Sequence, residues 1–236
     1  MADKKAERIQ TSILNGAEKK ALVYLASRQP GWVTSDLLTW FGTFGALVIA
    51  AGYILSDSSI AWLWLASLGL VINWYGDSLD GTLARVRNTQ RPLYGYYLDH
   101  TVDCINEALM FLGVGLSSLM RLDLALMIFV VYLFLTINVS VNAHLKSEFK
   151  LTYAKLGPTE FRVIAILMNV MFIFIRPLRE FASSFTLFGR LVEFQALDIA
   201  GAAILLILIV IYLTTVIGDA TAYAKIDPLP ERKGDD

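Results

Sequence analysis

Residues 77–103 read DSLDGTLARVRNTQRPLYGYYLDHTVD and lie between two strongly apolar stretches of the chain. The acidic residues of this segment form two pairs, Asp77 with Asp80 and Asp99 with Asp103. The spacings of three and four residues place each pair on one face of a helix. Carboxylates are costly at membrane depth and mark functional sites there. We therefore expect two neighbouring antiparallel helices that bring four carboxylates to one polar pocket.

The whole chain has the composition of an integral membrane protein. Of its 236 residues 56% are hydrophobic and 17% are charged, against about 25% charged in soluble domains, and the mean hydropathy is +0.57. Because about 20 mostly apolar residues suffice to cross a bilayer, we predict an all-α integral membrane protein with six transmembrane helices. The expected spans are residues 37–55, 60–76, 94–119, 124–143, 160–178 and 199–218.

The basic residues predict the orientation of these spans. Sixteen of the 20 Lys and Arg residues precede the first span or lie in the second loop, the fourth connection and the tail. The positive-inside rule then places both termini and the aspartate loop in the cytoplasm. We divide the chain into a cytoplasmic segment (1–35), a six-helix membrane domain (36–225) and a disordered cytoplasmic tail (226–236).

The segment 1–35 has its own apolar pattern. Ile9, Ile13, Ala17, Ala21 and Leu25 recur at helical spacing. This pattern predicts an amphipathic helix, either on the cytoplasmic membrane surface or as an ordinary solvated helix.

The residue types of the aspartate segment indicate a cation and a phosphate. Four clustered carboxylates cannot all stay ionised without compensation. His100 is adjacent to Asp99 and is expected to point away from its face, so the ligands are oxygens, which suit one or two Mg²⁺ or Mn²⁺ ions. Gly81 allows close backbone approach and Ala84 leaves space. Arg85 has the fork that binds phosphate oxygens, so we expect a phosphate or diphosphate site.

The complete pattern is D-x-x-D-G-x-x-A-R, nine residues, then G-x-x-x-D-x-x-x-D, in which the second glycine is Gly95. It resembles the signature of the CDP-alcohol phosphotransferases, and the expected six-helix layout is similar to that family too. The resemblance implies a membrane catalytic domain in which an alcohol attacks the β-phosphate of a CDP-linked donor and CMP leaves. It also implies that Asp77, Asp80 and Asp99 bind metal, that Asp103 is the general base and a further ligand, and that Gly81, Ala84 and Arg85 line the cytidine diphosphate.

The first span departs from the family pattern. Many relatives have Pro-Asn a few residues before a threonine, whereas this chain has Ser35-Asp36-Leu37-Leu38-Thr39. Thr39 matches the pattern and is assigned to the CDP site. Asp36 either replaces the missing asparagine there or caps the helix.

The acceptor alcohol is less well defined by sequence. In the stretch KLGPTEFR, Gly157-Pro158 indicates a turn and Thr159 a helix N-cap, which would carry Glu160 and Arg162 beside the aspartates. Glu160 would suit the ammonium of ethanolamine or choline and Arg162 a phosphate, unless the two residues pair with each other or interact favourably with the helix N-terminus. The lack of an arginine cluster favours an acceptor without phosphate.

Several alternatives stay open. The expected donor is CDP-diacylglycerol; CDP-ethanolamine or CDP-choline with a lipid alcohol is the alternative. Glu107 and Asp219 within apolar helices would also fit a cation transporter, and a scaffold protein of the same family is a further possibility.

The expected partners are membrane lipid and a second copy of the chain, because relatives form homodimers and Gly113, Gly115 and Ser117 permit close helix packing. Nothing indicates nucleic acid. The expected location is the plasma membrane of a bacterium or archaeon.

Overall fold

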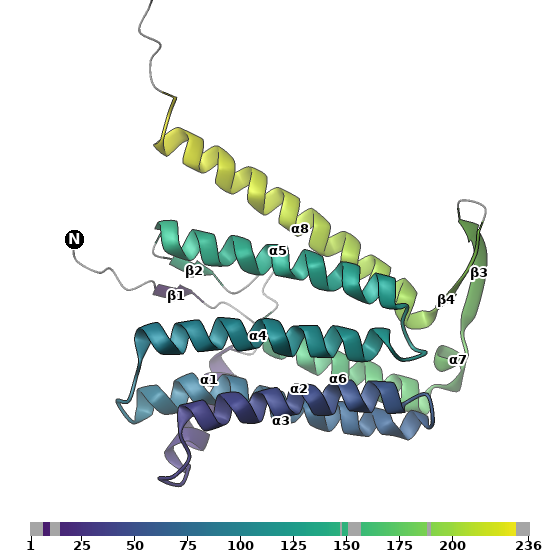
Figure 1. Ribbon diagram of the computed structural model, residues 1–236, viewed down its shortest axis with the longest axis horizontal. Helices are drawn as coiled ribbons and strands as arrows, with labels where there is room; N and C mark the ends of the chain where they lie inside the picture. The colour runs from purple at the N-terminus through teal and green to yellow at the C-terminus, as the bar shows by residue number, and fades with distance from the viewer. Residues whose placement is uncertain (1–6, 10–14, 147, 151–156, 188–189, 230–236) are drawn as a thin grey trace, which may run out of the picture.

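The structure is a computed structural model that describes residues 7–9, 15–146, 148–150, 157–187 and 190–229. It is mostly helical (Figure 1). In chain order the elements are β1 (Glu7–Ile9), α1 (Asn15–Ser27), α2 (Ser35–Leu55), a 3-10 turn (Ile60–Trp62), α3 (Leu63–Val86), α4 (Pro92–Gly115), α5 (Leu122–Lys146), β2 (Glu148–Lys150), α6 (Pro158–Phe174), α7 (Arg176–Arg179), β3 (Ala182–Leu187), β4 (Arg190–Gln195) and α8 (Ala196–Ile226).

The long helices follow the predicted spans. Among the described residues, three helices are long and apolar enough to cross a membrane, judged by length and composition: α2, α5 and α8. The other predicted spans coincide with α3, α4 and α6, which carry the charged residues of the predicted site. The six-span topology therefore stays a prediction, although each expected range contains a helix.

The first motif lies entirely within one helix. α3 continues through Asp77, Asp80 and Arg85 and ends at Val86. Asn88, with φ of 56°, then turns the chain in the left-handed conformation that asparagine tolerates. α4 begins four residues later with Pro92 in its first turn, a position that favours proline. This short turn sends α4 back antiparallel to α3, as Figure 1 shows.

The close contact between α2 and α3 fixes the position of the aspartate helix. A Cβ on Gly45 would overlap the backbone of Asn73, and one on Gly76 would overlap the backbone of Gly42. Only residues without a side chain allow two helix backbones to approach this closely. The core continues around the fully buried Ile49, Leu63 and Leu70, with Phe172 from α6.

The chain is mostly helical, as expected, but its described residues also include two short two-stranded sheets. β1 pairs in parallel with β2, and β3 pairs antiparallel with β4. The sequence of residues 182–195, ASSFTLFGRLVEFQ, is rich in β-branched and aromatic residues and lacks a run long enough to span a bilayer. Its two strands, β3 and β4, lie between α7 and α8 in the chain.

The N-terminal helix packs on the bundle by a face that includes only Leu25 of the predicted stripe within α1. Ile9 lies in β1, and α1 begins at Asn15. Leu22 and Ala26 are buried against Leu79 and Leu83 of α3, whereas Ala17 and Ala21 of the predicted stripe are exposed. Tertiary packing, rather than the longest apolar repeat, determines the buried face. The location of α1 on a membrane surface stays a prediction.

At the other end of the chain, α8 extends to Ile226. Residues 230–236 of the predicted disordered tail lie outside the described residues.

Candidate active site

Three of the four predicted metal ligands meet at the junction of α3 and α4. Carboxylate oxygens of Asp77, Asp99 and Asp103 lie within 4.8 Å of one another. This arrangement offers oxygen ligands from two helices at the spacing that a hard divalent cation requires, so the residues fit Mg²⁺ or Mn²⁺. His100 lies nearer than expected, with Nδ1 3.8 Å from Asp99 Oδ2. The same nitrogen is also 3.0 Å from the carbonyl oxygen of Tyr96, so the ring is held along its own helix.

Asp80 lies beside this group rather than within it. Its Oδ2 accepts a hydrogen bond of 2.6 Å from the Thr39 hydroxyl of α2, and its Oδ1 accepts one from the backbone N–H of Gly81. Asp80 still interacts electrostatically with Asp77 and Asp99. The structure thus joins Thr39, predicted for the CDP site, to a predicted metal ligand. The assignment of Asp80 as a ligand stays a prediction.

α6 contributes the positive charge of the site. Arg162 Nη2 lies 2.5 Å from Asp77 Oδ2, and Arg162 Nε donates to Asn73 Oδ1 at 2.9 Å. Asn73 is fully buried and donates through Nδ2 to the carbonyl of Gly42 at 3.0 Å. Because Arg162 is held by Asp77 and Asn73, the alternative in which it pairs with Glu160 is wrong for the described residues.

Asn73 is a site residue that sequence reasoning missed. The signal was present, since Asn73 is a polar residue in an apolar run, one helical turn before Asp77. It connects α2, α3 and α6, and it orients the arginine toward the carboxylates.

Glu160 has a structural task at the start of α6. Its Oε2 accepts a hydrogen bond of 2.9 Å from the backbone N–H of Gly157. Gly157 is the N-cap of α6, so the prediction of Thr159 at that position is wrong. Thr159 instead donates to Glu18 Oε1 of α1 at 2.6 Å, and Trp74 of α3 donates to the same oxygen at 2.8 Å. These contacts fix the first turn of α6, which carries Arg162. An ammonium site at the buried Glu160 stays an untested prediction.

The residues predicted to line the cytidine diphosphate lie at the C-terminal end of α3. Arg85 is exposed, and its Nη2 donates to the Thr82 hydroxyl at 2.8 Å. A Cβ on Gly81 would lie 3.3 Å from Arg85 Nη1, so a side chain at that position would restrict the guanidinium. Ala84 is half-buried on the same helix. A phosphate could therefore approach Arg85 from the exposed end of α3.

Asp36 and Gly95 flank this end of the site. Thr34 caps α2, so the capping alternative for Asp36 is wrong; Asp36 Oδ2 instead pairs with Arg91 Nη1 at 3.2 Å. No described atom lies within 4 Å of the position that a Cβ on Gly95 would occupy. It therefore provides room beside the first turn of α4 rather than a helix-packing surface.

The family models identify the class of protein that this site defines. A model described as CDP-alcohol phosphatidyltransferase matches residues 32–224, so the chain belongs to that family. The matched range includes every aspartate of the site.

Two curated proteins are similar over shorter stretches. A phosphatidylinositol phosphate synthase from Cutibacterium acnes is 38% identical over 84 residues, which is 36% of this chain and 38% of that protein. An uncharacterized protein from Aquifex aeolicus is 37% identical over 83 residues, 35% of this chain and 39% of that protein. The alignments thus cover less than two fifths of either relative.

Proposed function

We propose that this enzyme transfers a phosphatidyl group from CDP-diacylglycerol to an alcohol, releasing CMP, with the help of two divalent ions and Asp103 as general base. The observation that carries the proposal is the approach of carboxylate oxygens of Asp77, Asp99 and Asp103 to within 4.8 Å of one another, beside the half-buried Arg162. A cation path would explain carboxylates, but it would not explain an arginine held among them or the Gly81–Arg85 surface at the mouth.

Each residue of the site has a separate role in the proposed reaction. Asp103 takes the proton of the acceptor hydroxyl as its oxygen bonds to the β-phosphorus and the bond to the CMP oxygen breaks. Arg85, at the exposed end of α3, donates to phosphate oxygens. Divalent ions held by Asp77, Asp80, Asp99 and Asp103 would neutralise the diphosphate and the charge on the leaving group.

A CMP-release assay tests the proposal. Purified protein is incubated with labelled CDP-diacylglycerol, Mg²⁺ or Mn²⁺, and a panel of alcohols, and both CMP and the lipid product are measured. We expect CMP and a phosphodiester lipid in equal amounts, each dependent on the alcohol. CMP release only from CDP-ethanolamine or CDP-choline with diacylglycerol would establish the alternative donor. Ion flux without CMP would establish a transporter instead.

The proposed topology has six spans, with both termini and the site facing the cytoplasm of a bacterium or archaeon. Single cysteines at Thr89 and Ser58, in a Cys104→Ser background, test it in intact cells. Position 89 lies in the turn between α3 and α4 and position 58 between α2 and α3. An impermeant thiol reagent added outside should label position 58 and spare position 89; the reverse pattern contradicts the orientation.

A homodimer is part of the proposal, but the small residues of α4 that suggested a dimer interface do not support it. A Cβ on Gly113 would overlap Ala50 of α2, and one on Gly115 would meet Ala125 and Leu122 of α5. These glycines are therefore used for packing within one chain. A detergent-corrected mass equal to two chains would support the dimer, and a mass equal to one would contradict it.

A further inference from the structure

Glu18 of α1 connects two helices of the site that are distant from it in sequence. Its Oε1 accepts a hydrogen bond of 2.8 Å from Trp74 Nε1 of α3 and one of 2.6 Å from Thr159 Oγ1 of α6. The glutamate is half-buried, whereas its neighbours Ala17 and Lys19 are exposed. Hydrogen bonds to an ionised acceptor are shorter and stronger than neutral ones. One carboxylate oxygen that accepts from both helices therefore restricts how α3 and α6 meet.

Each donor lies three residues before a residue of the candidate site. On α3, Trp74 precedes Asp77 by this spacing. On α6, Thr159 precedes Arg162 by the same spacing. Residues three apart are neighbours on one side of a helix. The bridge through Glu18 and the ion pair of Asp77 with Arg162 therefore join the same two helices within about one turn of each other.

The far part of α6 is held by other contacts. There Asn169 Nδ2 donates to Ser67 Oγ of α3 at 3.1 Å, and Asn169 Oδ1 accepts from the hydroxyl of Tyr53 of α2 at 3.1 Å. All three of these side chains are buried. α6 is thus tied to the bundle at two levels, and at the level of its first turn the contact comes from α1.

A role for Glu18 as an anchor of α1 alone explains less of the geometry. α1 is also held by apolar side chains such as Leu22, which is buried against α3. In addition, Gln29 Nε2 donates to the hydroxyl of Tyr75 at 2.5 Å. A negative charge that favours the N-terminus of α1 needs no partner on another helix. The bond between Glu18 and Thr159 goes beyond both needs, because it acts on α6.

The contacts of Arg162 depend on the position of this first turn. Its Nε donates to Asn73 Oδ1 at 2.9 Å, and its Nη2 lies 2.5 Å from Asp77 Oδ2. The planar guanidinium makes both contacts only in one orientation. A shift of about 1 Å at the start of α6 would lengthen at least one of them beyond hydrogen-bond range. Asp77 would then lose its ion-pair partner beside the carboxylates of Asp99 and Asp103.

We propose that Glu18 is a positioning residue of the active site. By bridging Trp74 and Thr159, it sets the first turn of α6 so that Arg162 meets Asp77. Helix α1 is therefore part of the support of the site. The effect on turnover rests on the proposed function, whereas the placement of α6 does not.

A set of four variants tests the inference in the CMP-release assay. Glu18→Ala removes the acceptor of both bonds, Thr159→Val removes only the bond to α6, and Glu18→Gln keeps an oxygen that can accept both. Gln29→Ala is the control, because it removes a bond between α1 and α3 and none to α6. We expect kcat/KM to fall roughly 10- to 100-fold in Glu18→Ala and Thr159→Val, the effect of a small displacement of a site residue. Glu18→Gln should restore most of the turnover, and Gln29→Ala should match the wild type.

Two further measurements separate positioning from a general loss of stability. Arg162→Lys keeps the positive charge but lacks the fork that reaches both Asn73 and Asp77. In that background Glu18→Ala should cause little additional loss of turnover, because both changes act through the same contact. Amide hydrogen exchange should become faster at the start of α6 in Glu18→Ala and stay unchanged there in Gln29→Ala.

The possible results distinguish this inference from the proposed function. Additive losses from Glu18→Ala and Arg162→Lys, or an equal loss in Gln29→Ala, would show that Glu18 only anchors α1 and would overturn the inference. Wild-type turnover in Glu18→Ala would overturn it too and leave the proposed function in place. A wild type that releases no CMP with any alcohol would overturn the proposed function. Hydrogen exchange would then decide by itself, since an unchanged rate at the start of α6 in Glu18→Ala contradicts the placement and a faster rate supports it.

Discussion

Two helix pairs of this protein hold carboxylates within apolar segments, and they treat them differently. On α8, Asp219 Oδ2 accepts from Asn138 and Asn142 of α5 at 3.3 and 2.7 Å, and Tyr223 donates to the same Asn142 at 2.7 Å. On α3 and α4, three carboxylates face one another, and one arginine pairs with Asp77. Carboxylates with neutral amide donors hold two helices together, whereas carboxylates that face each other need a cation.

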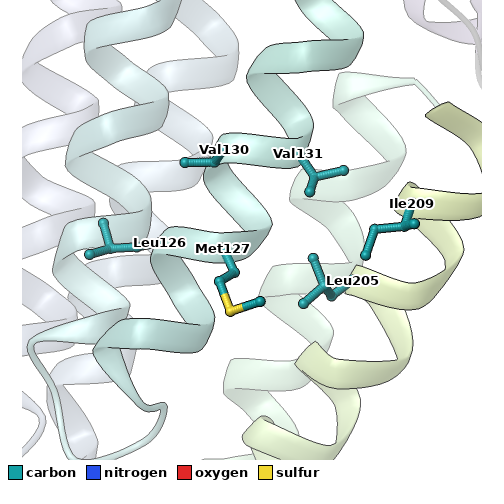
Figure 2. Close-up of a pocket in the computed structure, with 6 residues that line it drawn as sticks. All are labelled: Leu126, Met127, Val130, Val131, Leu205 and Ile209. Carbon is teal, nitrogen blue, oxygen red and sulfur yellow. The ribbon is translucent and has the colours of Figure 1, made fainter. Parts of the chain in front are cut away.

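The two regions also differ in how their helices pack. The backbones of α2 and α3 touch through glycines, which fixes the position of the aspartates. The contact between α5 and α8 is made by large apolar side chains and leaves a pocket of about 290 Å³. Figure 2 shows its lining, which is Leu126, Met127, Val130, Val131, Leu205 and Ile209. The backbone contact with α2 therefore positions α3, which carries Asp77 and Asp80, whereas the pocket between α5 and α8 is lined by apolar side chains.

Removal of divalent cations should have the largest effect, and it should affect only one of the two regions. Excess chelator should abolish CMP release, because Asp77, Asp99 and Asp103 then lack the positive charge that a diphosphate requires. Added Mg²⁺ or Mn²⁺ should restore turnover. Circular dichroism of the chelated protein should keep its helical signal, since the hydrogen bonds of Asp219 need no ion. Full turnover in chelator would remove the metal from the mechanism.

Neutralising one carboxylate in each region should give the next largest effect. Asp103→Asn keeps the size of the side chain but cannot take a proton, so turnover should fall roughly 10²- to 10⁴-fold. Binding of the CDP donor, measured at equilibrium, should change little. Asp219→Asn should leave turnover near that of the wild type. It should instead lower the free energy of unfolding by roughly 1–3 kcal/mol, because hydrogen bonds to a charged acceptor are lost.

The same pair of measurements tests the choice of base. If Asp103→Asn lost donor binding as severely as Asp77→Ala, while Asp99→Asn bound the donor without turning over, the base would be Asp99. If Asp219→Asn were inactive with a normal unfolding temperature, the α5–α8 pair would belong to the site, and the contrast between the two regions would be wrong.

Sequence reasoning predicted the helices and the aspartate cluster because both depend on short-range spacing. Apolar runs of bilayer length and the pairs Asp77–Asp80 and Asp99–Asp103 are visible in the chain itself. The contact between Arg162 and Asp77 could be predicted only in part. The turn at Gly157 indicated that α6 begins nearby, but its partners Asn73 and Asp77 lie more than 80 residues away in sequence.

Other features depended on tertiary contacts that no local pattern records. Two roles were open for Glu160, binding of the acceptor or interaction with the N-terminus of α6, and its contact with the backbone N–H of Gly157 agrees with the second. The glycines of α4 suggested a dimer interface, but they pack against Ala50 and Ala125 of the same chain. A small residue indicates close packing without indicating the partner. The bridging position of Glu18 could be recognised only once its partners on α3 and α6 were known.

The smallest expected effect comes from adding one methyl group in each region. Gly45→Ala places a Cβ against the backbone of Asn73, whereas Gly218 of α8 has nothing within 4 Å of that position. Overpacking of this kind costs about 1–3 kcal/mol, while alanine in place of an exposed helical glycine gains about 0.5–1 kcal/mol. Gly45→Ala should therefore lower the unfolding temperature in detergent, and Gly218→Ala should raise it slightly. Because Asn73 orients Arg162, turnover should fall only in Gly45→Ala. Equal effects of the two substitutions on the unfolding temperature would show that α2 and α3 are not in backbone contact. The proposed difference in packing between the two regions would then be wrong.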